Sequence, residues 1–217
     1  MCNSLEETVN LAKQLGFENI SVDLIYGLPT QTLEKLFSDL EKFLELGIQH
    51  ISTYGLKIEA ESFWGKNPPN VPDDDVQADM YELINQKLEQ NGFFRYEVSN
   101  FAQKDFESCH NLNYWNNNEY YGFGVAAHGY LDGARYSNFT TLEEYLEKPS
   151  THEIGHILSE EEKLEEEIFL GFRKTEGIDC ERIKEKFDID FETKYANVLK
   201  KYSDYIERTQ KGFALNL

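Results

Sequence analysis

The feature that most constrains this fold is a regular alternation of amphipathic helical segments with short apolar runs in the first hundred residues. Apolar residues recur at helical spacing within residues 4–15, 32–46 and 73–91. Apolar runs of strand length lie between and after these segments, at 20–26, 51–56 and 96–99. Strands joined by connections of helix length run parallel in one sheet. The sequence therefore predicts an α/β fold with a parallel, open or barrel-like sheet.

The texture of the chain changes after residue 100. Residues 100–138 are rich in Asn, Tyr and Gly and show no clear period. Beyond them, helices are predicted at 140–147, 159–172, 179–187 and 191–204, followed by a short hairpin around Gly212. We expect two domains, an α/β domain at 1–140 and a small helical domain at 141–217.

Charge and cysteine content exclude several classes of function. The 217 residues carry a net charge of −19, so a nucleic-acid backbone or an anionic membrane surface would repel the chain. The three cysteines, Cys2, Cys109 and Cys180, are too far apart for a CxxC pair or a disulfide framework. No targeting segment is found in the sequence. We expect a cytoplasmic protein that does not bind nucleic acid and does not dock electrostatically on membranes.

Three segments carry residue types suited to ligand binding. Asp23–Thr32 (DLIYGLPTQT) places a carboxylate in an apolar strand that ends where α/β folds bind ligands, although a capped strand-to-helix turn has the same pattern. His110–Trp115 (HNLNYW) is suited to ligating a metal or stacking on a flat ligand, or else packs internally. Tyr121–Gly129 (YGFGVAAHG) permits close approach to a phosphate, or forms a tight turn with a structural His128.

A metal site is not expected elsewhere in the chain. His152 and His156 would share a face of a helix, but Gly155 between them indicates a loop and no third ligand is near in the sequence. The glutamate-rich run at 160–167 lacks the spacing of a calcium loop and is interpreted as a solvated helix face.

Four segments, taken in order, resemble one family. They are DLIYGLPTQT at 23–32, YEVSNFA at 96–102, HNLNYW at 110–115 and YGFGVAAHG at 121–129. Over nearly its whole length the chain is similar to the oxygen-independent coproporphyrinogen III oxidase-like radical-SAM proteins, and HNxxYW is typical of their heme-chaperone branch. The resemblance implies the C-terminal half of a partial (β/α)6 radical-SAM barrel, followed by a small helical, winged-helix-like domain.

The resemblance also implies cofactors and site residues. Full-length members hold a 4Fe–4S cluster through CxxxCxxC, and its open iron binds S-adenosylmethionine. The positions that match S-adenosylmethionine contacts are Asp23, Ile25, Lys57 and His128. The positions that form the motif linked to heme are His110, Asn111, Tyr114 and Trp115. No catalytic residue is assigned.

The sequence departs from the family at its beginning, because it contains no CxxxCxxC and starts in the helix before the Asp23 strand. We expect a C-terminal fragment that is inactive alone, assembles no cluster and retains no cofactor tightly. Three functions stay open: heme binding and transfer, radical oxidative decarboxylation of porphyrinogen propionates, and an inert half-barrel. HNxxYW favours the first, with weak heme affinity through a loop at residues 110–115. The strand edge at residues 20–25 is expected to dimerise, or to be covered by the N-terminal helix.

Overall fold

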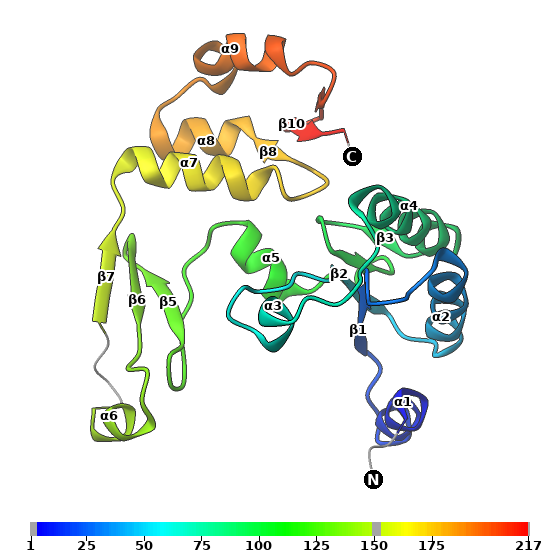
Figure 1. Ribbon diagram of the computed structural model, residues 1–217. Helices are drawn as coiled ribbons and strands as arrows, with labels where there is room; N and C mark the ends of the chain where they lie inside the picture. Colours follow the sequence, from blue (N-terminus) through cyan, green and yellow to red (C-terminus); the bar gives the residue numbers. More distant parts are fainter. Residues whose placement is uncertain (1–3, 149–152, 217) are drawn as a thin grey trace. The chain divides into compact units, whose positions relative to one another are not determined.

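The computed structural model, which describes residues 4–148 and 153–216, divides into two compact units, Met1–Ser108 and Cys109–Leu217 (Figure 1). Each unit has its own buried apolar core. The predicted domains, 1–140 and 141–217, divide the chain at a different place; as a division of the family's architecture they remain a proposal.

The first unit alternates helices and strands in the predicted order. Its helices are α1 (Leu5–Gln14), α2 (Leu33–Glu45), α3 (Phe63–Lys66) and α4 (Asp74–Gln90). Its strands are β1 (Ser21–Tyr26), β2 (His50–Gly55), β3 (Phe94–Arg95) and β4 (Asn100–Ala102). They form one sheet in the order β1-β2-β4-β3, in which β1 and β2 are parallel. The predicted α/β class and the parallel first pair are confirmed.

The third predicted strand is wrong in both place and direction. Residues 96–99 form no regular strand, because the chain turns back there between β3 and β4, which pair antiparallel. Strand β4 is also antiparallel to β2, with Asn100 opposite Ser52. The physical reason is Glu97, which is 1% exposed and accepts hydrogen bonds from the Ser99 N–H and the Asn100 side chain. The segment curls around this buried carboxylate and does not pair along its length.

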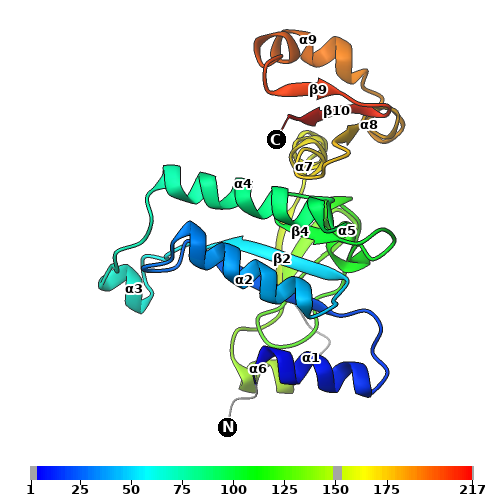
Figure 2. The ribbon, with the colours of Figure 1, turned by 90° about the vertical axis from the view of Figure 1, so that its right-hand side faces the viewer.

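Helices α2 and α4 cover one face of the sheet (Figure 2). Thr32 begins α2 as predicted, since its hydroxyl accepts from the Lys35 N–H at 3.3 Å, and Asp73 caps α4 through the Val76 N–H at 2.9 Å. The core between helices and sheet includes Val22, Leu24, Leu36, Leu40, Ile51, Met80, Ile84, Leu88 and Phe101. Because side chains alternate along a strand, Ser21, Asp23 and Ile25 of β1 lie on the opposite face, which we call the open face, and are exposed.

Helix α1 joins this core at the end of α2. Val9 is buried among the core residues, and the ammonium group of Lys13 donates to the carbonyl oxygen of Leu46. Gly47 then ends α2 with φ at +58°, a left-handed conformation that favours glycine. In the described ranges, no helix has the length and apolar character needed to cross a bilayer.

The second unit begins with irregular segments and ends in a compact helical part. It contains α5 (Cys109–Trp115), β5 (His128–Leu131), β6 (Ala134–Ser137), α6 (Leu142–Glu147) and β7 (Glu153–Ile157), and then α7 (Glu160–Gly171), β8 (Ile178–Asp179), α8 (Cys180–Phe187), α9 (Phe191–Lys201), β9 (Ile206–Arg208) and β10 (Gly212–Leu215). Two antiparallel sheets form, β5-β6-β7 and β8-β10-β9.

The C-terminal part of this unit has the predicted winged-helix-like form. Helices α7, α8 and α9 pack around Leu164, Ile178, Ile183 and Phe191, and the hairpin β9–β10 forms beside Gly212 as expected. Two local expectations were wrong. Residues 110–115 lie in the helix α5 and not in a loop, and Gly155 and His156 lie in strand β7.

Candidate functional site

The first predicted site lies on the open face of the sheet. Asp23 and Ile25 project from β1 on this face, as the sequence spacing predicted, and Ile25 is 47% exposed. The parallel register places Asp23 beside Ser52 and Ile25 beside Tyr54 of β2. A carboxylate next to two apolar surfaces can accept hydrogen bonds from the hydroxyl or amino groups of a ligand and cover a flat ring. These residues fit S-adenosylmethionine, although their role stays a proposal.

Lys57 and His128, the other two predicted contacts, are placed differently. Lys57 follows β2, points into solvent and forms an exposed ion pair with Glu59 at 2.9 Å. His128 begins β5 in the second unit and is exposed. Asp23, Ile25 and Lys57 belong to the first unit and His128 to the second, so the structure gives no common geometry for the four predicted contacts.

Sequence reasoning missed a chain of hydrogen bonds at the start of the open face. Ser21 Oγ lies 2.7 Å from His50 Nδ1, and His50 Nε2 lies 2.8 Å from the hydroxyl of Tyr96. His50 is 4% exposed, and its burial lowers the pKa of the imidazole, partly offset by the charge of Asp23. A neutral His50 uses one ring nitrogen as donor and the other as acceptor. The available signal was a histidine directly before a predicted strand.

The YEVSNFA segment contributes a buried polar turn. Glu97 accepts from the Ser99 N–H at 3.1 Å and from the amide of Asn100. One oxygen of each of these two side chains, Glu97 Oε2 and Asn100 Oδ1, is buried without a hydrogen-bond partner in the described part of the chain. Tyr96, the first residue of the segment, meets His50 as described above. The segment therefore shapes the end of the sheet.

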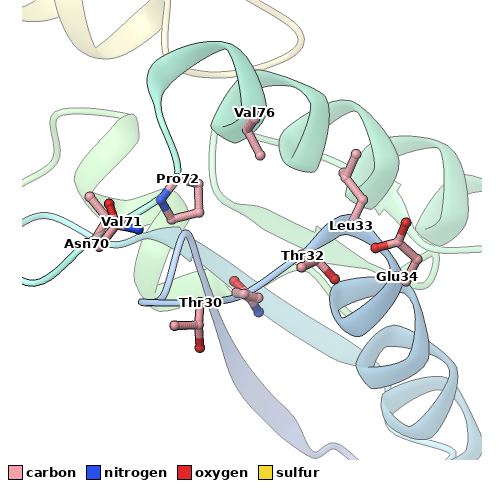
Figure 3. A pocket seen from close by; sticks show the side chains of 9 residues that line it. Thr30, Thr32, Leu33, Glu34, Asn70, Val71, Pro72 and Val76 are labelled. Atoms are coloured by element: carbon pink, nitrogen blue, oxygen red, sulfur yellow. The ribbon is translucent and has the colours of Figure 1, made fainter.

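A cleft of about 370 Å³ opens where the DLIYGLPTQT segment enters α2 (Figure 3). Thr30, Thr32, Leu33 and Glu34 line one side, and Asn70, Val71, Pro72 and Val76 line the other. The pKa of Glu34 is lowered by its own backbone N–H and by Thr32, so its carboxylate is charged at neutral pH. A negative charge at this wall disfavours an anion and suits a neutral or cationic group.

Helix α5 divides the HNLNYW motif between two faces. His110 and Tyr114 are four residues apart and meet edge to face, with ring centres 4.9 Å apart. Tyr114 in turn meets Tyr120 edge to face at 4.6 Å. His110 is exposed, so its imidazole is both braced by aromatic rings and open to solvent. This half of the motif has the geometry of a candidate ligand site.

Trp115 and Asn111 occupy a different face of α5 from His110. The guanidinium carbon of Arg173 lies 4.7 Å from the centre of the Trp115 ring. Asn116, the next residue, accepts from Lys174 Nζ at 2.8 Å, and its carbonyl oxygen accepts from Arg182. The structure therefore joins Trp115 to the C-terminal helices and does not stack it beside Tyr114.

The glycine segment 121–129 forms a firmly held turn. The amide of Asn138, which is 6% exposed, donates to the carbonyl oxygens of Gly122 at 3.0 Å and Gly124 at 2.8 Å. The Gly122 N–H donates to the hydroxyl of Tyr136 at 2.9 Å. A side chain at Gly122 would collide with the backbone of His128. Residues 121–129 therefore form a tight turn, which the sequence offered as the alternative to a phosphate-binding segment.

The described residues do not fit the ligand set of an iron–sulfur cluster. Within residues 4–148 and 153–216 no three His, Cys, Asp or Glu side chains converge as metal ligands. Cys109 is exposed and Cys180 is partly buried, which raises the pKa of its thiol, and both thiols are free. His156 pairs with Glu162 at 2.9 Å. Cys2 and His152 lie outside the described residues.

Comparisons with known proteins agree with this architecture. Residues 158–215 match the family model described as HemN C-terminal domain. The chain is 42% identical to the heme chaperone HemW of Lactococcus lactis, over 96% of this chain and 59% of that protein, and 40% identical to the heme chaperone HemW of Bacillus subtilis, over 87% and 52%. The solved structure of coproporphyrinogen III oxidase (HemN) from Escherichia coli, a radical SAM enzyme, matches 98% of this chain and 56% of that chain, with a TM-score of 0.78 and 20% identity.

The β1–β2 sheet with its helices, followed by a winged-helix-like part, is the architecture of the C-terminal portion of a radical-SAM enzyme of the coproporphyrinogen oxidase type. The family model, the curated relatives and the solved structure together support a fragment of a HemN/HemW-type radical-SAM protein. It spans between half and three fifths of the curated relatives named above. Full-length members of this family use S-adenosylmethionine and a 4Fe–4S cluster, and the described residues of this chain supply no ligands for that cluster.

Proposed function

We propose that this chain takes part in heme binding and transfer, as a portion of a heme chaperone. The single observation that carries the proposal is the exposed imidazole of His110, held edge to face by Tyr114 at 4.9 Å. Histidine nitrogen is a common axial ligand of heme iron. The relatives named as heme chaperones in the comparison support the same reading.

The position of His110 suits transfer as well as binding. Contacts with Tyr114 restrict the imidazole without burying it, so the ligand is oriented while heme remains accessible. Binding through one exposed imidazole leaves the second axial position of the iron open to a ligand from an acceptor protein. Heme then passes by exchange of one axial ligand for another, and no bond within the macrocycle changes.

Titration with ferric heme tests this function. The Soret band of heme is followed in wild type, His110→Ala and His156→Ala. The last variant is the matched control, because His156 is also an exposed histidine of the second unit but pairs with Glu162. We expect a ligand-induced Soret shift in wild type and His156→Ala and its loss in His110→Ala. Equal shifts in all three proteins would remove His110 as the ligand.

Three finer assignments belong to the same proposal. Asp23, Ile25, Lys57 and His128 are proposed to contact S-adenosylmethionine in the full-length protein. We place the activity in the cytoplasm, a reducing compartment that suits the exposed free thiol of Cys109. We also propose self-association of the isolated chain through β1, which pairs only with β2 among the described strands.

A further inference from the structure

Two buried hydrogen-bond donors lie side by side where α5 meets the C-terminal helices. Trp115 Nε1 and Arg173 Nε are both buried and have no hydrogen-bond partner in the described part of the chain. The two side chains are in contact, with the guanidinium carbon 4.7 Å from the centre of the indole. Two adjacent N–H groups that lack an acceptor therefore belong to one local site.

The energetic consequence of this arrangement is large. A buried donor without a partner destabilises a protein by about 1–3 kcal/mol, and native structures contain few of them. One oxygen-bearing anion could accept from both N–H groups, and an anion receives charge-assisted hydrogen bonds from a guanidinium group. The chemistry of the pair therefore matches a carboxylate.

The charges around the pair point the same way. No ion pair of Arg173 is found among the described residues, whereas the nearby carboxylates are engaged elsewhere: Glu167 binds Arg182 at 2.6 Å, and Glu176 binds Lys174 at 3.3 Å. Lys174 and Arg182 both reach Asn116, directly after Trp115. A chain with a net charge of −19 thus gathers three cations at the end of α5.

The same contacts fix the pair before any ligand arrives. The side chain of Asn116 accepts from Lys174, in the segment that follows α7, and its carbonyl oxygen accepts from Arg182 of α8. Helix α5 therefore ends at a defined position on the C-terminal part of the unit.

We propose that Trp115 Nε1 and Arg173 Nε together bind a carboxylate, and that in the heme-loaded chain this carboxylate is a propionate of the heme. The second clause rests on the proposed function. His110 and Trp115 are five residues apart on α5, or roughly 7.5 Å along a helix axis. Because they project from different faces, a heme ligated by His110 reaches the pair only with groups at its edge, which is where the propionates are.

The test compares heme with its dimethyl ester, in which both propionates lose their charge. The titrations use wild type, Arg173→Gln, Trp115→Phe and the control Arg208→Gln, whose guanidinium pairs with Glu192 on α9. We expect wild type and Arg208→Gln to bind heme about tenfold more tightly than the ester, the size of one charged hydrogen-bond contact. Arg173→Gln should lose this preference. Trp115→Phe keeps an aromatic ring but lacks the indole N–H, and it should reduce the preference.

A second probe does not depend on heme at all. Sodium propionate is added to ¹⁵N-labelled chain, and the indole and arginine Nε–H signals are followed by NMR, with sodium chloride at equal concentration as the control. We expect propionate alone to shift the signals of Trp115 and Arg173. Absence of these shifts together with equal binding of heme and ester would overturn the proposal. A preference for heme over the ester that survives Arg173→Gln would overturn it as well.

The two proposals can fail separately. If His110→Ala leaves the Soret band unchanged while propionate still shifts the Arg173 signal, the heme ligand is wrong and the carboxylate site stands. If His110→Ala abolishes the Soret shift while Arg173→Gln weakens heme and ester equally, the carboxylate site is overturned and the proposed function stands. Circular dichroism verifies that each variant is folded.

Discussion

At the scale of single residues, His50 shows how burial decides protonation. Its two ring nitrogens lie within hydrogen-bond distance of the hydroxyl groups of Ser21 and Tyr96. Neither hydroxyl carries a negative charge that would stabilise the protonated imidazole. Burial lowers the pKa of the imidazole, and the opposing effect of Asp23 is smaller. The neutral ring links the first residue of β1 to the YEVSNFA segment.

The shift at His50 predicts a dependence of stability on pH. The folded-state pKa lies below the unfolded value of 6.5, so the unfolded chain binds the proton more strongly. The contribution of the buried, neutral His50 to the free energy of unfolding is complete above pH 6.5. It is lost as the pH falls from that value toward the folded-state pKa. Urea unfolding at pH 8, 7, 6 and 5.5 should show a decline in wild type that is smaller in His50→Gln. An equal decline in both proteins would contradict this prediction, and His156→Gln serves as the exposed control.

Asn138 is the residue that holds the glycine segment. Replacing it with Ala leaves the carbonyl oxygens of Gly122 and Gly124 without their donor. We expect Asn138→Ala to lower the free energy of unfolding by about 1–3 kcal/mol, the loss for buried groups without partners. Thermal and urea unfolding measure this, with Asn118→Ala as an exposed control that should change stability little. A change no larger than that of the control would mean that solvent replaces the amide.

The candidate site shows which side-chain contacts can be predicted from a sequence motif and which cannot. Alternation along β1 was enough to place Asp23 and Ile25 on one face, because a strand repeats every two residues. The HNLNYW motif was interpreted as one loop, but in the helix α5 His110 pairs with Tyr114 while Trp115 meets Arg173, 58 positions further on. No local pattern indicates that second contact, and the same holds for His50 and Tyr96.

At the scale of helices and strands, prediction succeeded where an apolar stripe was long. Helices α2 and α4 have 13 and 17 residues, and their N-terminal caps, Thr32 and Asp73, are the first residues of the segments predicted to be helical. The elements that were missed are short: β3 has two residues, β4 has three and α5 has seven. Such elements carry too few residues to show a period and form because tertiary contacts hold them. Strand β7 was missed because Gly155 argues against a strand interior.

Glu167 joins two helices of the second unit and provides a test at this scale. It lies in α7, is 8% exposed and binds Arg182 at 2.6 Å and Lys186 at 2.8 Å, both from α8. Glu167→Ala leaves two cations without their shared partner, but both can still reach water. We therefore expect a loss of about 1–3 kcal/mol, below the range for fully buried pairs.

Chemical unfolding of Glu167→Ala and of Glu165→Ala measures this effect. Glu165 lies on the same helix and is exposed, so its replacement should leave stability nearly unchanged. High salt should not abolish the difference between the two variants, because the Glu167 carboxylate is shielded from solvent. If both variants unfold alike, the contacts of Glu167 do not join α7 to α8 energetically.

At the scale of the whole molecule, charge and an unpaired strand edge act against each other. Strand β1 has one neighbour among the described strands, and Ile25 and Tyr54 expose apolar surface beside that edge, at 47% and 43%. An unpaired edge with apolar neighbours favours pairing with a second chain. A net charge of −19 on each copy opposes that association through long-range repulsion.

These opposing effects predict self-association that strengthens with salt. Added ions screen the repulsion between copies, whereas hydrogen bonds along a strand edge and burial of Ile25 are little affected. Sedimentation velocity at low and high ionic strength should therefore show more dimer at high salt. Ile25→Lys adds a charge to the pairing surface and should reduce the dimer, whereas Phe169→Lys, at a 63% exposed position of α7, should not. A chain that stays monomeric at every salt concentration would contradict the edge as a pairing surface. A dimer weakened equally by both substitutions would place the contact away from β1.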